Sequence, residues 1–227
     1  MENVNIQVIA RMKSDFATKF GIPRQSGLVE ELRSTIVFEP EFRNPDTLRG
    51  IEDFSHLWLI WQFSEAVRTE WSPTVRPPRL GGNTRMGVFA TRSPFRPNSL
   101  GLSSVKLLGV EHTKEYGTVL HVGGADLMDG TPIFDIKPYL PFTDSHPDAL
   151  GGFAQEQNTA IEPLAVHFSD TLVSTFSAER LQALRGILSA DPRPHYHADE
   201  QRVYAFEFAG REVKFRVADG EVEAWVE

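Results

Sequence analysis

Two arginines stand four residues apart on a backbone stiffened by proline in TRSPFRPN, residues 91–98. Arg92 lies two residues before Pro94, and Arg96 lies directly before Pro97. A guanidinium group donates paired hydrogen bonds to a carboxylate or a phosphate. Proline reduces the conformational entropy that a loop loses when it binds. The segment is therefore interpreted as a preorganised loop that binds an anion.

Positive charge is concentrated around this loop. Residues 66–106 contain six arginines and one lysine against a single acid, Glu70, in a chain whose formal net charge is −8. An acidic protein is not a general binder of polyanions, so any contact with nucleic acid has to come from such a local basic patch. The alternative interpretation of these charges is a solvated surface with salt bridges to acids elsewhere.

A second polar cluster lies in ADLMDGTPIFDIKPYLPF, residues 125–142. Asp129 begins the turn sequence DGTP, for which an ordinary tight turn is the simplest interpretation. Asp135, Lys137 and Tyr139 then alternate in a segment with strand character, so their side chains are expected on one face. Three polar groups on one face of an apolar strand predict the wall of a pocket.

Other chemistry is excluded by what the chain lacks. It contains no cysteine, which excludes disulfides, thiolate metal sites and a cysteine nucleophile. His195 and His197 have no fixed carboxylate beside them and make a poor metal site, so no metal is expected. The sequence also lacks the G-x-G-x-x-G, Walker and G-x-S-x-G motifs, which argues against Rossmann-type cofactor binding.

Short apolar segments bounded by glycine or proline must position these side chains. Six of them are predicted as strands, at residues 5–10, 34–40, 55–63, 85–92, 100–111 and 117–124. The continuous apolar run at 55–63 is typical of a strand buried on both faces. The fold class is therefore predicted to be mainly β, with a single β-barrel-like N-terminal domain over residues 1–145.

The chain changes character after residue 145. Residues 146–163 are polar, contain Gly151-Gly152 and are predicted to be a linker. Residues 164–227 are predicted to form a small α+β C-terminal domain. Its expected elements are a strand at 164–169, a helix from the cap Ser177 to Asp191, and a hairpin of strands at 203–209 and 212–217, with a further turn at Asp219-Gly220.

Targeting signals are not apparent in the sequence. The N-terminal residues MENVNIQVIA contain no basic region followed by a long apolar stretch, so no secretory signal is predicted. The longest apolar run, at 56–63, is too short to span a bilayer. A cytoplasmic location is expected.

Several motifs resemble those of the TsaA-like family, in the same order along the chain. They are PRQSG (23–27), FSHLW (54–58), RPPRLGG (76–82), MGVFATRSPFRPN (86–98) and DLMDGTPIFDIKPYLPF (126–142). Within that family the chain is most similar to the bacterial tRNA (adenine(37)-N6)-methyltransferases of the TrmO type. DPRPHY (191–196) resembles a motif of their longer members, with His195 where a small residue is expected.

This resemblance implies a β-barrel methyltransferase that uses S-adenosyl-L-methionine. It implies a homodimer with the cofactor site near the subunit interface, and a substrate that is threonylcarbamoyladenosine at position 37 of threonine tRNA, methylated at N6. Carried over position by position, the cofactor contacts fall on Arg24, Gln25, Ser64, Glu65, Arg92, Leu102, Asp129, Gly130, Thr131 and Pro132.

Roles in catalysis and tRNA binding follow from the same resemblance together with the polar clusters. The candidates for catalysis are Asp126, Asp135, Lys137 and Tyr139, and one of the two aspartates would accept the proton that N6 loses. Contacts with the tRNA anticodon loop are expected from Arg76, Arg79, Arg85, Arg96, Asn98, Arg193 and Tyr196, assisted by the C-terminal domain. The alternatives are a methyltransferase of this fold acting on another small or RNA substrate, and a non-catalytic module that binds adenosylmethionine or a nucleotide.

Overall fold

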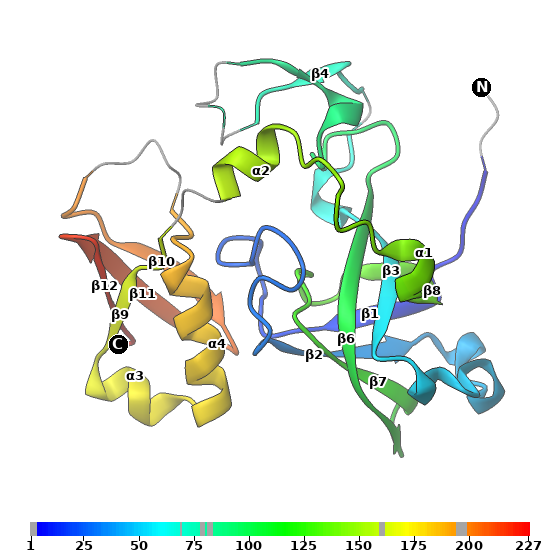
Figure 1. Ribbon diagram of the computed structural model, residues 1–227. Helices are drawn as coiled ribbons and strands as arrows, with labels where there is room; N and C mark the ends of the chain where they lie inside the picture. Colours follow the sequence, from blue (N-terminus) through cyan, green and yellow to red (C-terminus); the bar gives the residue numbers. More distant parts are fainter. Residues whose placement is uncertain (1–3, 69, 78–79, 81–83, 159–161, 194–198) are drawn as a thin grey trace.

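The computed structural model describes residues 4–68, 70–77, 80, 84–158, 162–193 and 199–227 of the 227-residue chain. A six-stranded barrel lies beside a smaller unit of one sheet and helices (Figure 1). In the described part of the chain, no helix is long and apolar enough to cross a membrane.

Six antiparallel strands close into a barrel in the order β1-β2-β7-β6-β3-β8. The strands are β1 (Ala10–Lys13), β2 (Arg33–Phe38), β3 (His56–Gln62), β6 (Leu100–Thr113), β7 (Gly117–Gly123) and β8 (Pro132–Pro138). The 3-10 turns η1 (Pro40–Phe42), η2 (Pro45–Leu48) and η3 (Ile51–Asp53) join β2 to β3. The predicted mainly β class with a barrel-like N-terminal part is confirmed.

Alternation of side chains fills the barrel. Leu57, Leu59 and Trp61 on β3 point inward and are buried, as successive residues of a strand point to opposite faces. Trp58 and Ile60 between them are only partly buried on the outer face. Burial of β3 on both faces, expected from its continuous apolar run, is therefore wrong: one face is buried and the other is partly open.

Two predicted strands differ from the observed ones. The first begins at Ala10 rather than residue 5, and Ala10 is the first residue in register with both β2 and β8. Residues 85–92 contain just the two-residue β5 (Met86–Gly87) and the 3-10 turn η6 (Val88–Ala90). The partner of β5 is β4 (Thr74–Val75), which is bounded by Pro73 and Pro77. Proline has no N–H to donate, so Pro73 contributes to this pairing only through its carbonyl, which accepts from the Val88 N–H at 2.9 Å.

The second unit is a four-stranded sheet packed on helices. Its elements are β9 (Ala165–Phe168), α3 (Asp170–Thr175), α4 (Ala178–Ser189), β10 (Tyr204–Phe208), β11 (Arg211–Ala218) and β12 (Glu221–Trp225), with the sheet order β10-β11-β12-β9. The Ser177 side chain accepts from the Arg180 N–H, so the predicted helix cap is confirmed. Along the sequence, α1 (Pro141–Asp144) and α2 (Phe153–Asn158) come between the two units, and α2 falls within the range predicted as a linker.

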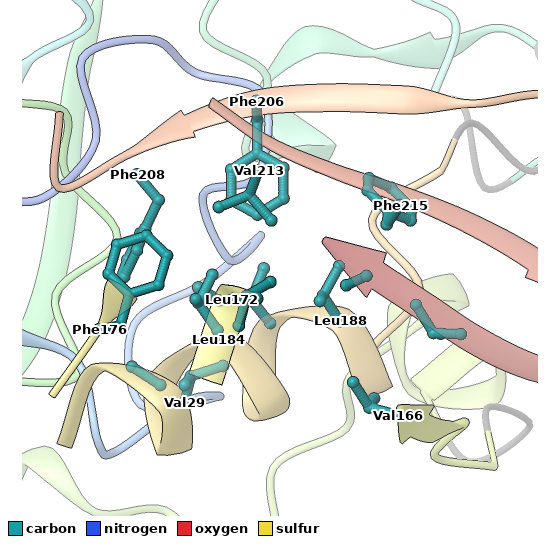
Figure 2. Close-up of a cluster of buried hydrophobic side chains, with 14 of the residues drawn as sticks. Val29, Val166, Leu172, Phe176, Leu184, Leu188, Phe206, Phe208, Val213 and Phe215 are labelled. Carbon is teal, nitrogen blue, oxygen red and sulfur yellow. The ribbon is translucent and has the colours of Figure 1, made fainter. Parts of the chain in front are cut away.

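The core of the second unit includes residues from the barrel half of the sequence. Phe16, Val29 and Leu32, in the connection between β1 and β2, are buried in the same cluster as Leu184 and Phe206. Figure 2 shows Val29 beside Leu184 of α4, opposite the phenylalanines of β10 and β11. Ion pairs add to this contact: Arg180–Asp15 and Arg33–Glu179, each at 2.8 Å. We call this cluster the shared core, because both halves of the sequence contribute to it, while the barrel has a separate core of its own.

Candidate active site at one end of the barrel

Three connections meet at the same end of the barrel, which we call the site end. They are residues 14–32 between β1 and β2, residues 63–99 between β3 and β6, and residues 124–131 between β7 and β8. Because neighbouring strands are antiparallel, all three connections leave the barrel from one end. The PRQSG, TRSPFRPN and DLMDG motifs, distant in sequence, lie in these connections.

Arg92 joins two of the connections. Its guanidinium donates to Oε1 of Gln25, and the Gln25 amide donates in turn to the Arg24 carbonyl. The other arginine of the loop has a different task, because Arg96 Nη1 donates to the Thr91 carbonyl at 3.1 Å. Arg92 is therefore turned towards Gln25, while Arg96 braces its own loop.

Asp126 lies beside this contact, in the third connection. Its Oδ1 accepts from Ser103 Oγ at 2.6 Å, and Ser103 Oγ accepts from Trp61 Nε1 at 2.9 Å. Burial raises the pKa of Asp126. The Ser103 hydroxyl, the backbone N–H groups of Asp126 and Ser26, and the positive charge of Arg92 oppose that rise. The site end thus contains a partly buried carboxyl group within the field of a guanidinium.

Ser103 and Trp61 were not among the residues predicted from the sequence. Ser103 does carry a signal, because it occupies an inward position of β6 between Gly101 and Val105. A hydroxyl at an inward position of a barrel strand needs a partner inside. That alternation could have identified Ser103 but not the residue it contacts.

The turn at Asp129–Pro132 serves the start of β8. Asp129 Oδ1 accepts from the Ser14 N–H at 3.0 Å, and the Gly130 N–H donates to the Met12 carbonyl at 2.8 Å. Thr131 and Pro132 are buried, whereas Asp129 is exposed and lines a cleft of about 760 Å³ between the barrel and the second unit. The turn shares the site end with Arg92, but no contact among the described residues joins the two.

Ser64 and Glu65 are exposed on the 3-10 turn η4 (Ser64–Ala66), immediately after β3. The Phe63 N–H donates to the Ser99 carbonyl at 2.8 Å, which brings η4 next to the end of the arginine loop. Leu102 instead pairs with Ile60 on the outer face of the barrel and is 56% exposed. Leu102 therefore points away from the barrel interior, into which Ser103 points.

Asp135, Lys137 and Tyr139 follow β8 away from the site end. Asp135 and Lys137 form an ion pair at 2.8 Å on the outer face, and the Tyr139 N–H donates to the His56 carbonyl at 2.9 Å, where β3 begins. The expectation that Asp135 and Lys137 share a face is confirmed by that ion pair. They do not share a described contact with Asp126.

An arm formed by β4 and β5 carries much of the basic segment (Figure 1). Arg76 and Arg85 are exposed on it, and Arg85 Nη1 donates to Thr74 Oγ1 at 3.2 Å. The rings of Trp71 and Phe89 lie 6.5 Å apart and are 55% and 75% exposed. The arm therefore presents guanidinium groups together with open aromatic rings.

The remaining predicted tRNA contacts are dispersed. Asn98 is exposed at the end of the arginine loop. The guanidinium of Arg193 forms hydrogen bonds of 2.8 and 2.9 Å with both carboxylate oxygens of Asp191. Arg79 and Tyr196 lie outside the described residues.

Comparison with known proteins identifies the family. The tRNA-methyltransferase O N-terminal domain matches residues 11–145, and the TrmO C-terminal domain matches residues 161–225. The chain is 41% identical to the Escherichia coli tRNA (adenine(37)-N6)-methyltransferase, over 99% of this chain and 98% of that protein. It is 40% identical to a putative S-adenosylmethionine-dependent methyltransferase of Pseudomonas aeruginosa, over 86% of this chain and 84% of that protein. A crystal structure of TrmO from Pseudomonas aeruginosa superposes with a TM-score of 0.78 at 30% identity, covering 99% of this chain and 98% of the other. The chain therefore belongs to the tRNA-methyltransferase O family.

Proposed function

We propose that this chain is an S-adenosylmethionine-dependent methyltransferase that methylates N6 of adenine 37 in tRNA. Its acceptor is threonylcarbamoyladenosine in threonine tRNA, which the reaction converts to the N6-methyl form. Family membership supports the reaction class. The observation that carries the proposal is the partly buried carboxyl group of Asp126 within the field of Arg92.

The residues of the site end suit the polar groups of S-adenosylmethionine. The guanidinium of Arg92 is exposed and matches the carboxylate of the cofactor. Exposed Ser64 and Glu65 offer a hydroxyl and a carboxylate to its ammonium group and ribose hydroxyls. When bound, S-adenosylmethionine supplies an electrophilic methyl group on a sulfonium. Arg92, Gln25, Ser64 and Glu65 would hold it.

Asp126 is the residue to which we assign the proton transfer. The N6 of threonylcarbamoyladenosine is a urea nitrogen, a weak nucleophile that must lose its proton as the new bond to carbon forms. A carboxylate whose pKa is raised by burial is a stronger base than an ordinary aspartate. Asp135 is the weaker candidate because its carboxylate is paired with Lys137 on the outer face.

The arm is where we place the tRNA backbone. Exposed Arg76 and Arg85 suit phosphates, and the open rings of Trp71 and Phe89 suit stacking on unpaired bases of the anticodon loop. We assign Arg193 to the structure of its own turn, since Asp191 occupies its guanidinium. Because tRNA is the substrate, we expect the enzyme to work in the cytoplasm.

A second copy of the chain is proposed to cover the outer face of β6. Leu100 and Leu102 there are 37% and 56% exposed, next to the partly buried Ile60 of β3. Contiguous exposed leucines on a sheet are typical of an interface between subunits. Leu102 points away from the site of its own subunit. A homodimer formed through this face would bring it close to the site of the other subunit.

The test is transfer of a labelled methyl group to two pools of tRNA. One pool comes from cells that make threonylcarbamoyladenosine, and the other comes from cells that cannot make it. We expect label only in the first pool, at threonine tRNA. Label in both pools would contradict the assigned acceptor and favour a methyltransferase of the same fold with another RNA substrate. Label in neither pool, with cofactor binding retained, would favour a non-catalytic binding module.

A further inference from the structure

A chain of two hydrogen bonds inside the barrel leads to Asp126. Trp61 Nε1 donates to Ser103 Oγ, and Ser103 Oγ donates to Asp126 Oδ1. We propose that Ser103, held by the indole of Trp61, is a positioning residue that orients the Asp126 carboxylate as the proton acceptor. The proposal rests on the function proposed above, in which Asp126 accepts the N6 proton.

The direction of the hydrogen bonds is fixed by chemistry. The indole N–H of Trp61 can only donate, so the Ser103 oxygen has to accept from it. An ionised carboxylate can only accept, so the single hydroxyl proton of Ser103 points to Asp126. If Asp126 were protonated on Oδ1, that proton and the Ser103 proton would compete for the same short contact of 2.6 Å. The hydrogen bond from Ser103 therefore favours the charged form of Asp126, which is the form that can act as a base, against the larger effect of burial.

Close packing inside the barrel fixes the orientation of the Trp61 indole. Trp61 is only 6% exposed, and its ring packs on Phe63 with centroids 4.3 Å apart. A Cβ at Gly101, which faces the indole from β6, would lie 2.3 Å from Cε2 and 2.5 Å from Cζ2 of Trp61. Gly101 is not in a left-handed conformation, so the ring alone requires glycine there. The indole cannot turn its N–H to Ser103 unless position 101 has no side chain.

Among the described residues, Arg92 is the positively charged group that acts on Asp126. Arg92 lowers the pKa of Asp126, as do the Ser103 hydroxyl and the backbone N–H groups of Asp126 and Ser26, against the larger effect of burial. Ser103 comes from β6, Arg92 from the connection 63–99, and Ser26 from the connection 14–32. Removing Ser103 leaves the burial and the other three groups in place. The pKa of Asp126 should then rise further.

Methyl transfer needs only the N6 of the substrate, the sulfonium of the cofactor and the Asp126 carboxylate. The N6 lone pair forms the bond to the methyl carbon while the carbon–sulfur bond of the sulfonium breaks and its electrons stay on sulfur. The N6 proton passes to the Asp126 carboxylate, which becomes a neutral acid and later releases the proton to water. Ser103 exchanges no proton with the substrate, so it is not itself catalytic.

The test compares pH–rate profiles of kcat for wild type and Ser103→Ala. The group is a base, so activity falls as pH drops through its pKa. A raised pKa in the variant therefore moves the acid limb to higher pH, with a loss of about tenfold at pH values below the new limb and much of the activity recovered above it. Ser103→Thr keeps a hydroxyl and should restore the wild-type limb. Ser34→Ala, at another buried inward serine of the barrel, is the matched control and should leave the profile unchanged.

A second measurement does not depend on activity. Titration of the Asp126 carboxyl carbon by NMR in ¹³C-labelled protein, assigned with Asp126→Asn, should give a higher pKa in Ser103→Ala than in wild type. Trp61→Phe removes the indole N–H but keeps an aromatic ring, and it should shift the pKa in the same direction. Gly101→Ala should act like Trp61→Phe, whereas Gly109→Ala on the same strand, where a Cβ meets nothing within 4 Å, should not.

The outcomes separate the two proposals. An active wild type with an equal loss at every pH in Ser103→Ala, or with no change at all, would overturn the positioning role while leaving the methyltransferase intact. An unchanged Asp126 titration in folded Ser103→Ala and Trp61→Phe would overturn it as well. Inactivity of wild type on either tRNA pool, with the titration shifted as expected, would instead remove the proposed function and keep the hydrogen-bond relationship.

Discussion

The guanidinium of Arg92 donates to the side-chain oxygen of Gln25, although 67 residues separate them in sequence. The contact joins the TRSPFRPN loop to the PRQSG loop and fixes the direction of one arginine in a segment that contains two. Arg96 turns back to the Thr91 carbonyl. A rigid cationic loop thus divides its two charges, one for a contact across the site end and one for its own conformation.

Arg92→Lys should weaken cofactor binding. Lysine keeps the positive charge but cannot make the paired contact of a guanidinium with a carboxylate. We expect the cofactor KM to rise about tenfold or more while the KM for tRNA changes little. Calorimetry should show a matching increase in the Kd for the cofactor. Arg85→Lys on the arm serves as the control. Equal increases in both KM values for Arg92→Lys would remove its assignment to the cofactor.

Asp126→Asn should abolish most of the activity without loss of cofactor binding. The amide cannot accept the N6 proton, and a positioned general base contributes about 10²–10⁴-fold to a rate. Steady-state kinetics would measure the fall in kcat, and calorimetry would measure the retained binding. Asp135→Asn, at the ion-paired residue on the outer face, should stay within about twofold of wild type. A large fall in kcat for Asp135→Asn with little change for Asp126→Asn would identify Asp135 as the base instead.

Asp126→Asn should also stabilise the protein at neutral pH. Burial raises the folded-state pKa of Asp126, so the folded state binds a proton more tightly than the unfolded state does. The contribution of Asp126 to the free energy of unfolding is therefore greatest at low pH. It falls as pH rises from the ordinary aspartate pKa through the raised value. Thermal unfolding of wild type and Asp126→Asn should converge in acid and separate above that range, with the variant melting higher. A separation that grows in acid would contradict the assigned shift.

The arm should dominate the salt dependence of tRNA binding. Each phosphate contact contributes about −0.7 to −0.9 to the slope of log Kobs against log salt concentration. Arg76→Ala and Arg85→Ala should each make the slope shallower by about that amount, while Trp71→Ala should weaken binding by about 1–3 kcal/mol with the slope unchanged. Arg49→Ala, at an exposed arginine on the connection from β2 to β3, is the control. An affinity that does not depend on salt would contradict this role of the arm.

The shared core can be tested with a double substitution. A Cβ at Gly186 would lie 2.7 Å from Cγ1 of Val29, so Gly186→Ala should destabilise by about 1–3 kcal/mol although alanine favours a helix. Val29→Ala in the same chain should recover part of that loss, because it removes the methyl groups in conflict. Chemical denaturation measures both effects. Additive losses in the double variant would show that the two residues do not meet in solution.

Much of the fold follows from local patterns in the sequence. Alternating inward residues such as Leu57 and Leu59 define the strands, and Ser177 with its following apolar spacing defines the start of α4. The ends of β1 and β5 do not follow, since a strand ends where its partner ends and not where its own apolar residues stop. The shared core was also not predicted, because Phe16 and Val29 lie in a segment that locally resembles an ordinary loop.

The site is predictable only in part for the same reason. Arg92 and Asp126 can be chosen from residue type and from resemblance to a family. The alternation along β6 indicates Ser103, but its contact with Trp61 follows only from the pairing of β3 with β6. Asp135 looked equivalent to Asp126 in sequence, and the direction of β8 separates them, since it leads Asp135 away from the site end along the outer face.

The shared core also bears on what happens if the chain is cut. Residues 145–152, which join the two units, are exposed along their whole length, whereas Phe16, Val29 and Leu32 are sealed inside the smaller unit. We expect the two fragments left by a protease cut in that exposed stretch to stay associated, because each would expose apolar side chains to water if they separated. The smaller unit also holds the base of the connection whose tip carries Arg24 and Gln25. The smaller unit therefore supports the loop to which we assign cofactor binding.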